Sequence, residues 1–127
     1  MNKIKIMIDG ISLIAVLENN LTGKKIWAAL PFEAQVTTWG DEIYFEIPVT
    51  VEQEPDARVD VDVGTLGYWP PGKALCIFFG PTPISKNEKP RAASPVNVCG
   101  RMTVATTALR NLPEGARVRV ERAVAGK

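Results

Sequence analysis

Two segments of the chain carry side chains that could contact a ligand, and both alternate in polarity. Residues 41–49 and 74–79 place a large apolar side chain at every second position: Ile43, Phe45, Ile47, Val49, Leu75, Ile77 and Phe79. Because residues i and i+2 of a β-strand lie on one face, these side chains are expected in the core. The opposite parity predicts an outer face made by the remaining side chains: Glu42, Tyr44, Glu46, Ala74, Cys76 and Phe78.

The two outward sets are expected to form one groove, rimmed by two tryptophans, a lysine and the loop 81–95. That loop has fifteen residues with four prolines, and loops of this length inside a compact domain are often functional. Rings beside a thiol, a phenol and carboxylates would form an amphipathic pocket suited to a peptide or a small organic ligand. The alternative interpretation is that Glu42 and Glu46 only solvate an exposed face. The predicted groove residues are Trp39, Glu42, Tyr44, Trp69, Lys73, Cys76, Phe78, Pro81, Pro83 and Arg91.

The residue types present exclude several kinds of catalytic site. The chain has no histidine, which removes Ser-His-Asp and Cys-His arrangements and histidine metal ligands. Its two cysteines, Cys76 and Cys99, form no CxxC pair and lie among apolar residues. Buried reduced thiols are therefore expected, not a zinc or redox site. No glycine-rich phosphate-binding motif is present, so we predict no catalytic residue, no metal site and no cofactor.

Composition and charge are those of an ordinary globular domain. The 127 residues are 46% hydrophobic and 23% charged, and a single domain over residues 1–127 is expected. Residues 1–85 carry 6 Lys/Arg against 11 Asp/Glu, whereas residues 86–127 carry 9 against 3. We expect these opposite charges to meet in cross-strand ion pairs, and no nucleic-acid partner.

Nothing in the sequence indicates a membrane partner. No apolar run approaches the length of a membrane span, and the N-terminal MNKIKIMIDG is a charged alternating segment unlike a signal peptide. The expectation is therefore a cytoplasmic protein.

Alternation with period two predicts a mainly β protein. Two short helices are expected, one capped by Asn20 and ended by Pro31, and one turn over residues 106–112. Strands with one solvent-exposed polar face and one buried apolar face are typical of antiparallel sheet. Closing about eight such strands into a barrel would remove exposed sheet edges. Strands are expected over residues 3–8, 11–17, 41–49, 58–63, 74–79, 96–104 and 117–120.

Four long runs of the sequence carry a family resemblance. They are GISLIAVLENNLTGKKIWAALPFEA, GDEIYFEIPV, VDVGTLGYWPPGKALCIFFGPTP and KPRAASPVNVCGRM. The first resembles the opening strand and helix of the cyclophilin fold, and the others resemble a prokaryotic family of small stand-alone cyclophilin-like proteins. The resemblance covers nearly the whole chain. It implies a closed, roughly eight-stranded antiparallel barrel with a helix near each end.

The resemblance does not extend to the residues with which cyclophilins isomerise X-Pro bonds. Those enzymes use an arginine, a glutamine, an aromatic floor and a histidine on the outer face of the barrel. The arginine-bearing motif falls on about residues 35–45, QVTTWGDEIYF, which contain neither arginine nor histidine. Ala74 and Cys76 stand where the glutamine and a floor aromatic would be, and Val96 stands at the histidine.

The sequence therefore predicts a binding module for a peptide or small molecule, with prolyl isomerase activity absent or very weak. One alternative is a divergent prolyl isomerase that uses Arg91 as its donor. Another is an interaction subunit, such as a homo-oligomer, in which exposed aromatic side chains form the contact. The register is tested by Phe78, because a bulge at residues 39–41 would move Phe78 into the core and Phe79 outside.

Overall fold

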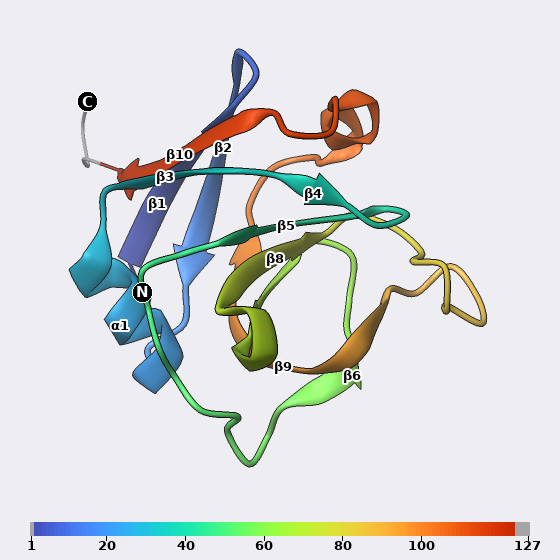
Figure 1. Cartoon of the computed structure of the whole chain (residues 1–127), viewed down its shortest axis with the longest axis horizontal. Coiled ribbons are helices and arrows are strands. Elements are labelled where there is room, and N and C mark those ends of the chain that lie inside the picture. The colour runs from blue at the N-terminus through green and yellow to red at the C-terminus, as the bar shows by residue number, and fades with distance from the viewer. Residues whose placement is uncertain (1, 124–127) are drawn as a thin grey trace.

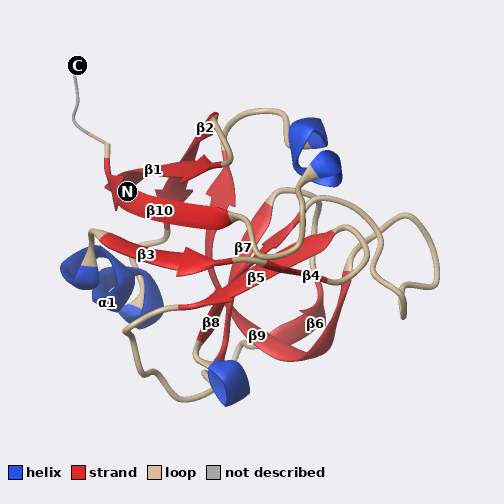
Figure 2. Cartoon of the chain, turned by 45° about the horizontal axis from the view of Figure 1, so that its top comes forward, coloured by secondary structure: helices blue, strands red, loops and turns tan. Residues whose placement is uncertain are grey.

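The computed structural model describes residues 2–123, and most of the regular structure in that range is β-strand (Figures 1 and 2). The same range contains one α-helix, α1 (Leu21–Ala29), and two 3-10 turns, η1 (Pro70–Gly72) and η2 (Thr107–Asn111). None of these described helices is long and apolar enough to cross a membrane. The strands are β1 (Asn2–Ile8), β2 (Ile11–Leu17), β3 (Phe32–Gln35), β4 (Thr37–Thr38), β5 (Glu42–Glu46), β6 (Arg58–Asp60), β7 (Thr65–Trp69), β8 (Ala74–Phe78), β9 (Arg91–Met102) and β10 (Arg117–Arg122).

Helix α1 begins and ends where the sequence predicts. The Asn20 side chain accepts a hydrogen bond from the backbone N–H of Gly23 at 2.9 Å, which satisfies one of the free donors of the first turn. The helix stops at Leu30, before Pro31. The second predicted helix is instead the 3-10 turn η2. It has five residues and no side-chain cap, and Pro113 follows its C-terminal end closely.

The strands form an antiparallel sheet, as predicted. Their hydrogen-bonded order is β3-β10-β1-β2-β9-β7-β8-β5-β4, and β6 pairs with β9 off this path. Every pair in this order is antiparallel. The predicted mainly β class is therefore confirmed.

The sheet differs from the predicted closed eight-stranded barrel, because hydrogen bonds do not join its two end strands. These ends, β3 and β4, follow one another in the chain with only Val36 between them. Strand β3 pairs with β10, whereas β4 pairs with β5. Strand β5 ends at Glu46. The Ile47 N–H still donates to the Lys73 carbonyl at 2.9 Å, in register with the pairing of β5 and β8, but Pro48 has no N–H to donate. The two end strands are therefore joined through the backbone at Val36, whereas in a closed barrel they would pair by hydrogen bonds.

One large core lies on the inner face of this curved sheet. It contains the side chains whose parity predicted burial, and Ile26 of α1 packs against it. Inward side chains come from both ends of the chain, since β1 lies between β2 and β10. The innermost members include Ile4, Ile6, Ile8, Ile43, Phe45, Leu66, Leu75, Ile77, Val118 and Val120.

A second, smaller core lies on the outer face, because β9 is long enough to serve two layers. Its C-terminal part pairs with β2 and β7 in the main sheet, and its N-terminal part pairs with β6 (Figure 1). The pairing of β9 with β7 shifts register at Leu66 and Gly67, where a bulge bends the strand. A Cβ on Gly67 would lie 2.7 Å from Val96 Cγ2, so only glycine lets β9 approach this closely. The outer core contains Val61, Cys76, Phe78, Ala92 and Val96.

Candidate functional site

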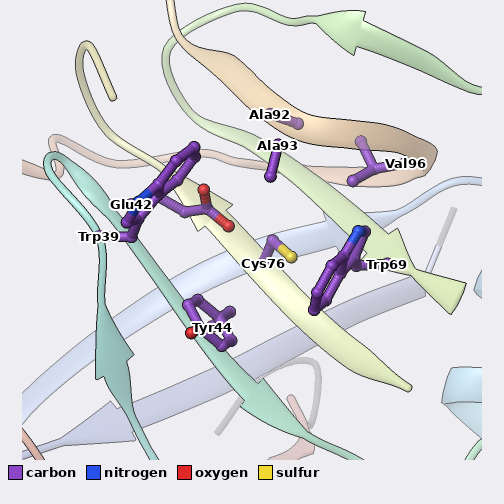
Figure 3. A pocket seen from close by; sticks show the side chains of 8 residues that line it. All are labelled: Trp39, Glu42, Tyr44, Trp69, Cys76, Ala92, Ala93 and Val96. Atoms are coloured by element: carbon purple, nitrogen blue, oxygen red, sulfur yellow. The ribbon is translucent and has the colours of Figure 1, made fainter. Parts of the chain in front are cut away.

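A pocket of about 220 Å³ opens on the outer face, where the cover provided by β9 is incomplete (Figure 3). Its base comes from β5 and β8, which pair so that Glu42 lies opposite Phe78 and Tyr44 lies opposite Cys76. Strand β9 forms one wall, and the ends of the pocket are marked by the two tryptophans. The lining residues are Trp39, Glu42, Tyr44, Trp69, Cys76, Ala92, Ala93 and Val96.

The register that sets this face is the one predicted from alternation. Glu42 and Trp39 exchange backbone hydrogen bonds, with the Trp39 N–H to Glu42 carbonyl bond at 2.9 Å and the reverse bond at 3.2 Å. The tight turn at Gly40 and Asp41 therefore adds no bulge that would shift the side chains of β5. Phe79 joins the inner core and Phe78 the outer one, as predicted.

Glu42 is the only charged residue of the lining, and it is buried at 5% exposure. Burial raises the pKa of its carboxyl group from 4.5 to about 7, while a hydrogen bond with the Cys76 thiol acts in the opposite direction. The carboxyl group points toward the middle of the pocket, beside Cys76 (Figure 3). Near neutral pH it is therefore poised between an acceptor and a donor of protons.

Cys76 remains a neutral thiol. Burial raises its pKa well above the ordinary value, and the negative charge of Glu42 raises it further. Because the thiolate is the nucleophilic form, this environment is the opposite of the one that activates a cysteine. Cys99 is also a free, buried thiol, but it lies in the inner core on the other side of the sheet.

Three aromatic side chains line the pocket together with the carboxyl group. The Trp69 indole N–H donates to Ser94 Oγ at 2.6 Å, which fixes the orientation of this ring against β9. Tyr44 meets Trp69 edge to face, with ring centroids 6.3 Å apart and planes inclined by 66°. Trp39 lies on the opposite side of Glu42, at the start of the β4–β5 turn (Figure 3). The site thus combines an acidic floor with aromatic walls.

Comparison with known proteins assigns the chain to a family. A family model described as cyclophilin-like matches residues 2–121. The chain belongs to the cyclophilin-like family. Among solved structures, the solution structure of a hypothetical protein from Archaeoglobus fulgidus is similar, with 39% sequence identity and a TM-score of 0.82. That match covers 96% of this chain and 95% of the other, and confirms the resemblance seen in the sequence. A comparison with curated proteins gave no match.

Half of the groove residues predicted for this cyclophilin-like chain lie outside the pocket lining. Phe78 points outward as predicted, but its side chain is fully buried in the outer core with Val61, Ala92 and Val96 and does not line the pocket. Lys73 is exposed at the end of η1, where its carbonyl accepts the Ile47 N–H.

The other three residues belong to the segment predicted as a long loop. The Pro81 carbonyl accepts the backbone N–H of Asp41 at 3.0 Å, and Pro83 is exposed beside Gly40. The Arg91 guanidinium lies 3.5 Å from the Asp60 carboxylate on β6. Arg91 also begins β9, so the segment predicted as a loop over residues 81–95 is shorter than expected.

Sequence reasoning missed the β9 wall of the pocket. Ala92, Ala93 and Val96 line it, but the PRAASPV run has no clear alternation, and its sequence predicts a loop as far as residue 95. The sequence signal for this wall is the small size of the side chains at Ala92 and Ala93, which leave room for a cavity between β9 and the base formed by β5 and β8. In residues 2–123, no group of three or more acidic or cysteine side chains is arranged to hold a metal ion.

Proposed function

We propose that this chain binds a small organic ligand or a single peptide side chain in the outer-face pocket, and that it does not isomerise prolyl bonds. The observation that carries the proposal is the Glu42 carboxyl group, buried at the floor of an otherwise apolar pocket between three aromatic side chains. A carboxyl group in this position destabilises the fold once it ionises. Perturbed groups of this kind concentrate at functional sites.

A purely structural role for Glu42 would require a partner that offsets its burial. Within residues 2–123, no basic side chain forms an ion pair with Glu42. Its side-chain partner is the Cys76 thiol, which is a weak donor. The favourable interaction that would balance the charge is therefore left for a ligand to make.

The size of the pocket limits the ligand. A volume of about 220 Å³ lies below the range of about 300–1,000 Å³ that is usual for drug-sized ligands. It suits the end of one side chain or a molecule of a few non-hydrogen atoms. A folded partner could contribute such a side chain while resting on the surrounding surface.

The residues around the pocket support binding over isomerisation. The resemblance puts Cys76 and Val96 at positions that carry catalytic side chains in cyclophilins, and both line the pocket. Neither can donate a strong hydrogen bond to a prolyl nitrogen. Arg91, the donor required by the alternative hypothesis, pairs with Asp60 and is not among the lining residues.

The binding function can be tested with an amide-resolved NMR screen of small organic fragments and short peptides. Hits are expected to shift the amide signals of Glu42, Tyr44, Cys76 and Ala93. The variant Ala93→Phe fills the mouth of the pocket from an exposed position and should abolish these shifts. The matched control is Ala28→Phe on the exposed side of α1, which should retain them. Hits that survive Ala93→Phe, or a complete lack of hits, would refute the proposal.

Isomerase activity is tested separately with a protease-coupled assay on several X-Pro peptides. The expected rate is that of the uncatalysed reaction, whose barrier is about 18–20 kcal/mol. Turnover comparable to that of cyclophilins would favour the divergent isomerase, and Arg91→Ala would then identify its donor. If size-exclusion chromatography instead shows an oligomer that Trp69→Ala dissociates, the aromatic surface is a subunit contact.

A further inference from the structure

We propose that the ligand of this pocket carries an alkylammonium group, whose positive charge lies between the Glu42 carboxylate and the rings of Trp39, Tyr44 and Trp69. This inference rests on the proposed function and names the chemical class of its ligand. The four side chains converge on one cavity from β5, β7 and the turn before β5 (Figure 3). Aromatic rings attract cations through their negative faces, and a carboxylate adds a direct charge interaction.

The charges at the pocket disfavour the other ligand classes. Its lining contains one acidic residue and no lysine or arginine. The two basic residues predicted for the rim are directed elsewhere, since Lys73 is exposed beyond η1 and Arg91 pairs with Asp60 at 3.5 Å. An anionic ligand would meet the Glu42 charge with no cation to offset it. A neutral ligand would do nothing to offset the cost of ionising Glu42 in this buried position.

Burial makes the charge interaction stronger than it would be at the surface. Glu42 is 5% exposed and hydrogen-bonds to the Cys76 thiol, and the rest of the pocket lining is three aromatic rings and the aliphatic side chains of β9. A cation held there is screened less by mobile ions than one at the surface. The T-shaped contact between Tyr44 and Trp69 and the hydrogen bond from Trp69 to Ser94 hold two of the rings in place before a ligand enters.

Binding should be coupled to the ionisation of Glu42, because a cation favours the carboxylate over the neutral acid. The pKa of about 7 means that a large part of the population must release a proton when the cation binds near neutral pH. The other titratable groups that line the pocket are the Cys76 thiol on β8 and the Tyr44 phenol on β5, and the lining residues of β9 have none. Asp41, adjacent in the turn, lies 3.6 Å from Arg110.

The test compares cations with uncharged molecules of the same shape, using the full chain and tryptophan fluorescence with NMR titration as readouts. Choline is paired with 3,3-dimethyl-1-butanol, and n-butylammonium is paired with n-butanol. At pH 8 at least one cation should bind about tenfold more tightly than its neutral partner. Choline has no titratable group in this range, so a fall in its affinity between pH 8 and pH 5.5 reports on the protein. That fall should exceed about tenfold, because only the ionised fraction is competent to bind.

Two variants assign the effect to Glu42. Glu42→Gln keeps the shape of the side chain and should remove both the preference for cations and the pH dependence. Glu46→Gln changes an exposed carboxylate on the same strand, outside the pocket, and should leave both unchanged.

The outcomes separate this inference from the proposed function. Equal binding of a cation and its isostere, or an undiminished preference in Glu42→Gln, would overturn the ammonium assignment while leaving a ligand pocket. The same holds if neither cation binds but neutral fragments still produce shifts that Ala93→Phe abolishes. If neither the cations nor the fragments bind, the proposed function fails as well.

Discussion

The buried carboxyl group of Glu42 makes the stability of this protein depend on pH in a way that one substitution isolates. In the unfolded chain the carboxyl group has its ordinary pKa of 4.5, whereas in the folded chain burial raises the pKa to about 7. Between these values the folded state holds a proton that the unfolded state has lost. The free energy of unfolding must therefore fall as pH rises through this window.

The magnitude follows from the difference between the two pKa values. At about 1.4 kcal/mol for each pH unit, the raised pKa corresponds to about 3 kcal/mol. The contribution of neutral Glu42 is fully present below pH 4.5 and is lost once pH exceeds about 7. Little discount for solvent screening is needed, because the residue is only 5% exposed.

The assay is urea unfolding of the natural chain and of Glu42→Gln at half-unit steps from pH 4 to pH 9. Many other carboxylates also titrate, but they are common to both proteins, so the difference between the two curves isolates Glu42. The natural chain should lose about 3 kcal/mol relative to Glu42→Gln across this range. Only the change with pH is diagnostic, since the substitution can shift stability by a constant amount.

Glu46→Gln provides the matched control on the same strand. Its side chain is exposed, so its curve should run parallel to that of the natural chain. Parallel curves for Glu42→Gln and the natural chain would refute the reasoning, as would an NMR titration that gives Glu42 a pKa below 5. Either result would mean that water solvates the floor of the pocket more freely than its burial indicates.

Three further predictions concern the same layer of the molecule. Burial raises the pKa of both Cys76 and Cys99, so Ellman's reagent should label them only after unfolding, and rapid labelling of the native protein would contradict this. Phe78→Ala should lower the free energy of unfolding by about 3–5 kcal/mol, because the ring is fully buried in the outer core; a negligible loss in urea unfolding would show that the ring is not packed there. Ser94→Ala should cost about 1 kcal/mol and shift tryptophan emission, because the hydroxyl accepts the Trp69 indole N–H; an unchanged emission spectrum would argue against that bond.

Alternation in the sequence was sufficient to assign side chains to the two faces of β5 and β8. Parity depends only on neighbouring residues, and the tight turn at Gly40 preserved it. The Asn20 cap was equally local, because the side chain and the N–H that it accepts lie three residues apart. In both cases the information needed for the structure is contained in a short stretch of chain.

Local sequence patterns could not predict that β9 covers the outer face. Strand β9 reaches Phe78 only because its pairing with β7 is bulged and because Gly67 leaves room for Val96. The contact joins residues far apart in sequence, and no periodicity encodes it. The strand pattern does not encode the open seam between β3 and β4 either, because it arises from the pairing of β3 with β10 and of β4 with β5.

The inner and outer cores also explain why the pocket lies on the outer face of β5 and β8, beside β9. All five residues of β8 are buried, since the inner core covers one face and β9 covers the other. Larger side chains in place of Ala92 and Ala93 would extend the outer core over Glu42 and Cys76. The chain instead has two alanines there, and below them a carboxyl group whose ionisation costs about 3 kcal/mol of stability above pH 7. A glutamine at position 42 would keep the shape and avoid that cost, so the acid is best understood through what its charge can bind.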